Sequence, residues 1–143
     1  MGKVLFWWHN YWYRYGMLKK ITLSLLTLVS LTAMTADIFD TVVQTLKSGQ
    51  AKEVAKYFNT NVALTMLNDE GIYSKQQAEV IMKNFFSQNP PKNVTIQHRG
   101  ASAGGAKFAV AIYECAQGNF RAYIFMKDAG NGMLIHELRI EKD

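Results

Sequence analysis

Cysteine is nearly absent from this chain, and its scarcity excludes several kinds of site. Cys115 is the single cysteine among 143 residues, so no disulfide can form within the chain. The chain also has no C-x-x-C spacing, His-rich run or paired Cys/His spacing for a redox centre or a zinc ion. Cys115 lies in an apolar strand pattern beside Ala116, and we expect it to be a small buried hydrophobe rather than a reactive thiol.

Net charge is also small once the N-terminal segment is set aside. Four of the 16 Lys and Arg residues, and none of the 11 Asp and Glu residues, lie in residues 1–36. Residues 37–143 therefore carry a formal charge of +1, and the basic isoelectric point of the whole chain arises mainly from the N-terminal segment. A nucleic-acid-binding surface needs Lys and Arg clustered on one face, so the sequence predicts no nucleic-acid partner.

Residues 1–36 have the order of charge and hydropathy that directs a chain to export. Lys19 and Lys20 precede an uncharged run over residues 21–36, rich in Leu, Thr and Ser, and the acidic Asp37 follows it. As a helix this run would span about 24 Å. The hydrocarbon core of a bilayer is about 30 Å thick, so a permanent membrane span is not expected.

We therefore expect a signal peptide, cleaved after Thr35 or Ala36, and a mature protein in the periplasm or outside the cell. The alternative is an uncleaved leader, which would then be the only membrane contact. All three tryptophans of the chain lie in residues 2–16. We interpret this stretch as an extension upstream of the true start at Met17, rather than as an aromatic anchor at a membrane interface. Residues 37–143 then form one domain.

Helical periodicity marks the first part of this domain. Apolar residues recur at helical spacing after Asp37, and Gly49 ends the pattern. Ser74 and Gln77 have the spacing of a capping box, and the two prolines after Asn89 end the helix that follows it. The expected elements are a helix over residues 37–49, a short helix over residues 51–58, a strand over residues 62–67, a turn at residues 68–71, a short return strand at residues 72–73 and a third helix over residues 74–89.

From residue 92 the period changes from 3.6 to 2, which predicts strands. Short glycine-containing connections make neighbouring strands antiparallel, so the pattern indicates a meander. The expected strands are residues 93–99, 106–115, 119–127 and 133–141. Alternation assigns one side of the sheet to the helices, namely Val94, Ile96, His98, Phe108, Val110, Ile112, Phe120, Ala122, Ile124, Met126, Leu134, His136, Leu138 and Ile140. The mixed opposite side carries Thr95, Gln97, Arg99, Tyr113, Arg121, Tyr123, Phe125, Lys127, Glu137, Arg139 and Glu141.

Helices followed by an antiparallel meander resemble the nuclear-transport-factor-two-like (cystatin-like) cone, in which a curved sheet wraps around helices. The motifs that carry a closer resemblance are Phe85-Phe86 to Asn89-Pro90-Pro91-Lys92, His98-Arg99-Gly100-Ala101-Ser102 and Asn119-Phe120-Arg121. They are similar to those of a family of small exported proteins of unknown function with that fold. The resemblance implies an α+β domain whose N-terminal helices pack on a curved antiparallel sheet. It implies no reaction and no site.

The leading functional hypothesis is a non-catalytic ligand-binding or accessory module. A modest apolar pocket between the third helix and the curved sheet would hold a small apolar ligand or part of a protein partner. Its expected lining residues are Met82, Phe86, His98, Phe108, Ile112 and Phe120. The alternative is that these six residues simply fill the core.

An enzyme of the isomerase/dehydratase or hydrolase kind is the second hypothesis, with His98 and a tyrosine inside the cone. No catalytic motif supports it, and no residue set predicts a cofactor. His98 and His136 lie on the first and last strands of the meander, roughly 14 Å apart by strand spacing, so no metal site is expected. The glycine-rich residues 100–105 precede a strand rather than a helix, which predicts a hairpin turn and not a phosphate loop.

A structural homodimer is the third hypothesis. Tyr113, Arg121, Tyr123 and Phe125 would form an aromatic and basic patch on the outer side of the sheet, which is typical of a subunit interface. Alternatively, Glu137 and Arg139 pair with Arg121, and this side faces water.

Overall fold

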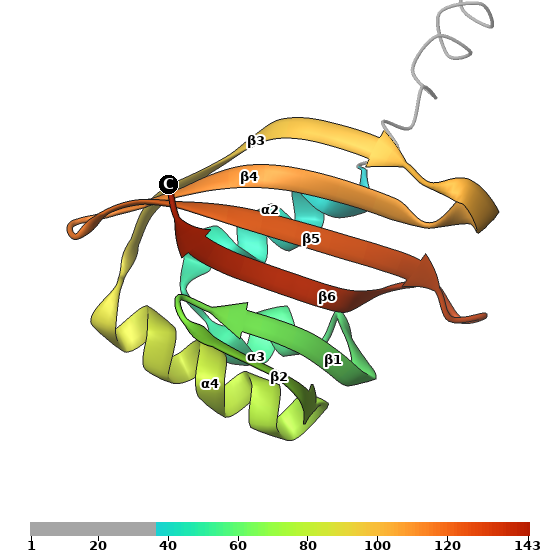
Figure 1. The fold of residues 1–143 in the computed structure, drawn as a ribbon, viewed down its shortest axis with the longest axis horizontal. Helices are drawn as coiled ribbons and strands as arrows, with labels where there is room; N and C mark the ends of the chain where they lie inside the picture. The colour runs from blue at the N-terminus through green and yellow to red at the C-terminus, as the bar shows by residue number, and fades with distance from the viewer. Residues whose placement is uncertain (1–36) are drawn as a thin grey trace, which may run out of the picture. The chain divides into compact units, whose positions relative to one another are not determined.

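The computed structural model describes residues 37–143, so the expectations for the leader, its cleavage and the start at Met17 fall outside the described residues. Helices come before most of the strands, as expected (Figure 1). The elements are α2 (Ile38–Ser48), α3 (Ala51–Ala55), β1 (Phe58–Met66), β2 (Asp69–Ser74), α4 (Lys75–Gln88), β3 (Pro91–Ala101), the 3-10 turn η2 (Ala103–Gly105), β4 (Lys107–Cys115), β5 (Gly118–Asp128) and β6 (Met133–Lys142).

Capping residues set the ends of the two longer helices. The Asp37 carboxylate accepts a hydrogen bond from the Phe39 N–H at 3.2 Å, and Gly49 ends α2 in the left-handed conformation (φ 67°). At the start of α4, the Ser74 hydroxyl accepts from the Gln77 N–H, while the Gln77 side chain accepts from the Ser74 N–H. The predicted first and third helices are therefore confirmed.

The segment between α2 and α4 differs from the prediction in two places. The second helix ends at Ala55, because Phe58 is already the first residue of β1. Phe58 lies opposite Ile135 in the sheet, and its side chain is buried. The turn predicted at residues 68–71 is tighter than expected, since Leu67 and Asn68 alone connect β1 to β2. Glu70 and Gly71 therefore belong to β2.

The six strands of residues 37–143 form one sheet in the order β2-β1-β6-β5-β4-β3. Strands β3 to β6 form the predicted antiparallel meander. The β1–β2 hairpin joins this meander through a parallel pairing of β1 with β6. The sheet is therefore mixed, which corrects the expectation of a wholly antiparallel sheet. Parallel neighbours require a long connection, and here it contains α4 and the strands β2, β3, β4 and β5.

Helices α2, α3 and α4 lie on one side of the curved sheet, which we call the inner face (Figure 1). Helix α2 contacts β3 and β4, whereas α4 contacts α3, β1 and β2. An aromatic cluster of Phe85, Phe86, Tyr113 and Phe120 fills the space between α4 and the meander. The expected α+β architecture is thus confirmed. Within residues 37–143, no helix is long and apolar enough to cross a membrane.

Strand β4 shows the opposite facing from the prediction. Tyr113 pairs with Val94 and Phe120, both of which are buried on the inner face. Tyr113 therefore faces the helices together with the small residues Ala109 and Ala111. Phe108, Val110 and Ile112 consequently lie on the opposite side, which we call the outer face. Both sides of β4 are apolar, so alternation alone gave the wrong side.

Two β-bulges reverse the expected facing in other strands. In β3, a register shift between Ile96 and His98 places His98 opposite Val110 on the outer face and Arg99 opposite Ala109 on the inner face. In β6, a shift near His136 brings Ile135, rather than Leu134 or His136, into the core. The Nε2 atom of His136 is buried there without a hydrogen-bond partner among the described residues.

The inward position of Arg99 ties β3 to the start of α2. Its guanidinium donates to Asp37 Oδ2 at 2.7 Å and also to the Asp40 carboxylate. Partial burial alone would raise the pKa of Asp37, but the Phe39 N–H and the Arg99 guanidinium together hold it below its usual value of 3.8. The same carboxylate therefore caps the helix and anchors it to the sheet.

We predict that Arg99→Ala lowers the free energy of unfolding by up to about 1 kcal/mol, as expected for a partly exposed ion pair. Because the pKa of Asp37 is lowered in the folded state, its stabilising contribution is complete above about pH 3.8 and is lost as the pH falls below that value. Urea unfolding at neutral and acidic pH measures both effects. Arg121→Ala is the control, since Arg121 pairs only with the chain-terminal Asp143. Equal losses in the two variants, with the same acid dependence, would contradict the assignment.

Candidate functional site

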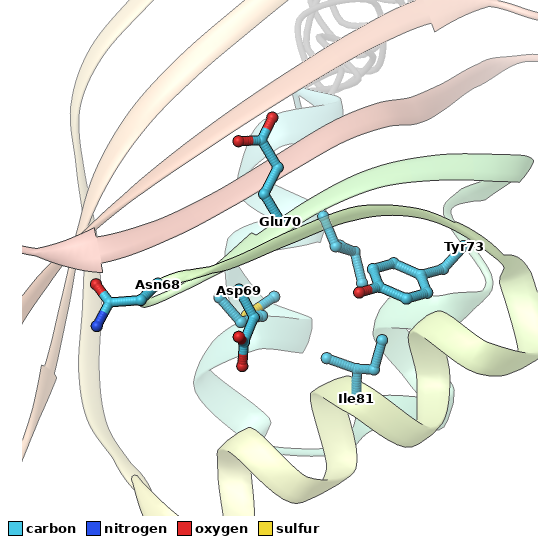
Figure 2. Close-up of a pocket in the computed structure, with 7 residues that line it drawn as sticks. Asn68, Asp69, Glu70, Tyr73 and Ile81 are labelled. Carbon is cyan, nitrogen blue, oxygen red and sulfur yellow. The ribbon is translucent and has the colours of Figure 1, made fainter.

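A cavity of about 410 Å³ lies between α4 and the β1–β2 hairpin (Figure 2). It lies beside the third helix, but at the hairpin and not at the meander strands where the sequence places a pocket. Its lining residues are different from those expected. They are Leu64, Met66, Asn68, Asp69, Glu70, Tyr73 and Ile81.

Strand alternation explains why these side chains meet. Leu64 and Met66 face inward from β1 and are buried. On β2, Asp69 and Tyr73 share the inward side, because Asp69 pairs with Met66 and Tyr73 pairs with the buried Val62. Helix α4, which follows β2 in the chain, contributes Ile81 on the side of the cavity that faces the hairpin. The cavity therefore has an apolar floor and a polar rim.

Gly71 allows the Tyr73 ring to lie along the hairpin. An ideal Cβ built on Gly71 would be 2.7 Å from both Cζ and the hydroxyl oxygen of Tyr73. A side chain at position 71 would have to displace the ring. The position of Tyr73 in the cavity therefore depends on the absence of a side chain two residues earlier.

Two polar groups in the cavity have no partner of their own. Figure 2 shows Asp69, Tyr73 and Ile81 directed into the space between the hairpin and α4, while Glu70 is directed to the other side of the sheet. Within residues 37–143, neither the Asp69 carboxylate nor the Tyr73 hydroxyl makes a hydrogen bond or an ion pair. The cavity thus offers one free carboxylate and one hydroxyl above an apolar surface.

The lining residues do not form a catalytic pair. Asp69, Glu70 and Tyr73 are its titratable groups, and none of them hydrogen-bonds to another. Across the described residues, no group of three or more His, Cys, Asp and Glu side chains is arranged to hold a metal ion. Cys115 is buried, as predicted, and its thiol donates to the Gly118 carbonyl at 3.3 Å.

The sheet separates the six residues that the sequence assigned to one pocket. Met82, Phe86 and Phe120 are buried in the inner core, as the alternative interpretation had it. His98, Phe108 and Ile112 lie on the outer face instead. The expected grouping is therefore corrected, because the β3 bulge and the facing of β4 move the last three residues away from α4.

The four expected interface residues are likewise divided. Tyr113 is fully buried on the inner face, where its hydroxyl donates to the carbonyl of Asn89. Burial raises the pKa of Tyr113. Arg121, Tyr123 and Phe125 do lie on the outer face, so only these three can take part in a surface there.

The outer face carries an aromatic row that the sequence did not reveal. The His98 ring lies 5.8 Å from Phe108, and the Phe108 ring stacks 6.1 Å from Tyr123. Gly100 makes room for this row, since a Cβ there would be 2.3 Å from Cζ of Phe108. The Arg139 guanidinium continues the row at 5.6 Å from Tyr123, and Lys127 lies 5.3 Å from the neighbouring Phe125 ring.

Charges on the outer face pair locally. Arg139 donates to Glu137 on its own strand, and Arg121 donates to Asp143 at 2.8 Å. Hydrogen bonding to Glu137 is the main cause of the raised pKa of Arg139, with smaller contributions from Glu141 and Glu70. The expected pairing of Arg121 with Glu137 therefore does not form.

Comparison with known proteins decides the family. A model described as "Domain of unknown function (DUF4783)" matches residues 39–141, most of the chain. The chain belongs to this family. The resemblance inferred from the Phe85 to Lys92, His98 to Ser102 and Asn119 to Arg121 motifs is therefore confirmed. None of the curated proteins compared with the chain matches it.

Solved members of the family have the same fold. A family protein from Bacteroides uniformis is 30% identical with a TM-score of 0.70, over 75% of this chain and 98% of that chain. One from Bacteroides ovatus is 30% identical with a TM-score of 0.67, over 71% of this chain and 92% of that chain. A Nostoc punctiforme domain of unknown function with a cystatin-like fold, 6% identical with a TM-score of 0.59 over 73% and 72%, shows the fold alone.

Proposed function

We propose that residues 37–143 are a non-catalytic binding module whose ligand occupies the cavity between α4 and the β1–β2 hairpin. The observation that carries this proposal is the free Asp69 carboxylate above an apolar floor of Leu64, Met66 and Ile81. The cavity volume of about 410 Å³ is within the usual range for ligand sites.

The chemistry of the lining defines the class of ligand. An apolar group of the ligand packs on Met66 and Ile81, since burying apolar surface is the main source of affinity. A cationic group or strong hydrogen-bond donor reaches Asp69, because a carboxylate without a partner accepts such a donor strongly. The ligand is therefore amphipathic, with an apolar body and a positively charged end.

Catalysis by His98 with a tyrosine has no support in this geometry. His98 is exposed on the outer face beside Phe108, not inside the cone. The tyrosine of the cavity, Tyr73, lies on the opposite side of the sheet. A general base must be within hydrogen-bond reach of its reacting group, and this pair cannot share one substrate.

A homodimer through the outer face is the second candidate. The aromatic row, together with Phe125, gives this face partly exposed rings rather than a uniformly charged surface. Both signs of charge lie around it, since Arg139 pairs with Glu137, Lys127 lies over the Phe125 ring and Arg121 pairs with Asp143. Mixed charge around an aromatic centre suits a second copy of the same surface.

We also propose that the domain acts after export. The support is the order of Lys19, Lys20 and the uncharged residues 21–36, directly before Asp37. A nearly neutral domain without a disulfide is compatible with an oxidising or a reducing compartment.

We predict that n-octylamine binds the cavity of a protein made of residues 37–143 alone. A solved relative from Bacteroides uniformis, of which 98% is covered by the match, consists almost entirely of this domain. Asp69→Asn should weaken octylamine at least about tenfold, because a charged hydrogen bond is lost, and should leave n-octanol unchanged. Ile81→Ala should weaken both ligands. Titration calorimetry measures the affinities, with Val80→Ala, an exposed neighbour on α4, as the control. Equal octylamine affinity in all four proteins would exclude the cavity as the site.

For the dimer, we predict that the wild-type domain sediments as a dimer at high concentration. Phe125→Glu should raise the dimer dissociation constant at least about tenfold, because it places a charge among the aromatic rings. Val80→Glu, on the helix side, should have no effect. A monomer at every concentration would remove this candidate.

For export, we predict that the full-length chain expressed in a Gram-negative host is recovered from the periplasm with Ala36 or Asp37 as its first residue. Replacing Lys19 and Lys20 by Glu should slow the processing. Mass spectrometry of cell fractions identifies the N-terminus. Recovery of the uncut chain from the cytoplasm alone would reject the proposal.

A further inference from the structure

Among residues 37–143, strand β2 leaves one row of backbone groups without a partner. It is the first strand in the sheet order, and the pairing with β1 is the only one it makes within these residues. The Ser74 N–H donates to the Gln77 side chain at 3.0 Å, so it is directed away from β1. Backbone direction alternates along a strand. The N–H and C=O groups of Ile72 and Glu70 are therefore directed to the same open side as Ser74.

This edge lacks two of the usual protections against strand addition. Natural edge strands are blunted by proline, by bulges, by charged side chains or by covering elements. The opposite edge strand, β3, begins with Pro91 and contains a bulge. By contrast, β2 pairs with β1 without a register shift and has no proline. Ile72 is also 79% exposed, the largest value among the exposed large hydrophobic residues.

The open edge runs directly above the cavity. Asp69 and Tyr73 of β2 face inward and line it, while Glu70 and Ile72 of the same strand face outward. A strand added beside β2 would continue this alternation. Its inward side chains would lie over the cavity opening, and its outward side chains would lie beside Ile72.

We propose that β2 binds an extended polypeptide segment as an added strand, and that an inward lysine or arginine of this segment enters the cavity. This rests on the proposed function and names its ligand class. The aliphatic part of the side chain packs on Ile81 and the Tyr73 ring, and its charge reaches Asp69. The outward neighbour is apolar and packs on Ile72. Glu70 adds a second carboxylate next to the edge, so the partner segment is basic.

Backbone pairing gives the affinity in such complexes and the pockets give specificity. Ile72 and Glu70 each offer one donor and one acceptor, so a short segment of alternating Val and Lys satisfies both. The Asp69 carboxylate then selects for the basic residue at one position. In this proposal, the open edge of β2 provides affinity and the adjacent cavity, through Asp69, provides specificity.

The test uses the peptide acetyl-Thr-Val-Lys-Val-Lys-Val-Thr-amide and ¹⁵N-labelled residues 37–143. We expect the peptide to bind and to slow hydrogen exchange at the Glu70 and Ile72 amides by at least about tenfold, since these amides gain a partner. Two N-methylated versions of the peptide are compared. Methylation along the edge that pairs with β2 should abolish binding, and methylation along the other edge should leave it unchanged.

Matched protein variants locate the contact. Ile72→Pro removes the edge N–H without removing a β1 hydrogen bond, and should weaken the peptide at least about tenfold while octylamine still binds. Ile72→Val should bind the peptide within about threefold of wild type, because the N–H and a β-branched side chain remain. If Ile72→Pro does not fold, the two N-methylated peptides give the same distinction.

The outcomes separate this proposal from the proposed function. Octylamine binding without any peptide binding overturns strand addition and leaves the cavity as a ligand site. Peptide protection of Glu70 and Ile72 without octylamine binding supports strand addition and rejects the small-ligand site. Equal binding of the two N-methylated peptides overturns strand addition. If these amides become protected without peptide as the protein concentration rises, the edge pairs with a second copy of the chain. That outcome would also overturn the proposal.

Discussion

The parallel pairing of β1 with β6 is the contact on which the rest of the domain depends. It joins a local hairpin, made of residues near one another in the chain, to a meander formed by the last fifty or so residues. Without this pairing, the β1–β2 hairpin would not be joined to the meander, and α4 would not be held against the sheet through β1. The buried side chains Leu64 and Met66 contribute at this seam to the core and to the cavity floor at the same time. The core and the proposed binding site therefore share the same residues.

The two faces of the sheet differ in how far helices cover them. The inner face is closed over most of its area by α2, α3 and α4, and the aromatic cluster around Tyr113 completes the closure. At β2 the coverage ends, because α4 crosses below the hairpin and leaves a space beside Ile81. The outer face has no covering element among the described residues, and its rings pack on one another instead. The two proposed surfaces thus lie on opposite sides of the sheet.

Local signals in the sequence predict much of this structure. Asp37, Gly49, Ser74 and Gln77 act on residues within a few positions, so they mark the helices correctly. The facing of β4 could not be read in the same way, because its apolar residues occupy both sides. Nothing local to Gln97 indicates the bulge that exchanges His98 with Arg99. The cavity was equally hidden, since residues 68–71 were expected to form a turn and not the start of a strand that directs Asp69 toward α4.

The contact between Gly71 and the Tyr73 ring gives one position control over the width of the opening. Any larger residue there would swing the phenol aside and reshape the entrance, yet the core beneath would be untouched. A single exchange at this point would therefore change which molecules fit the proposed site, at little cost to folding.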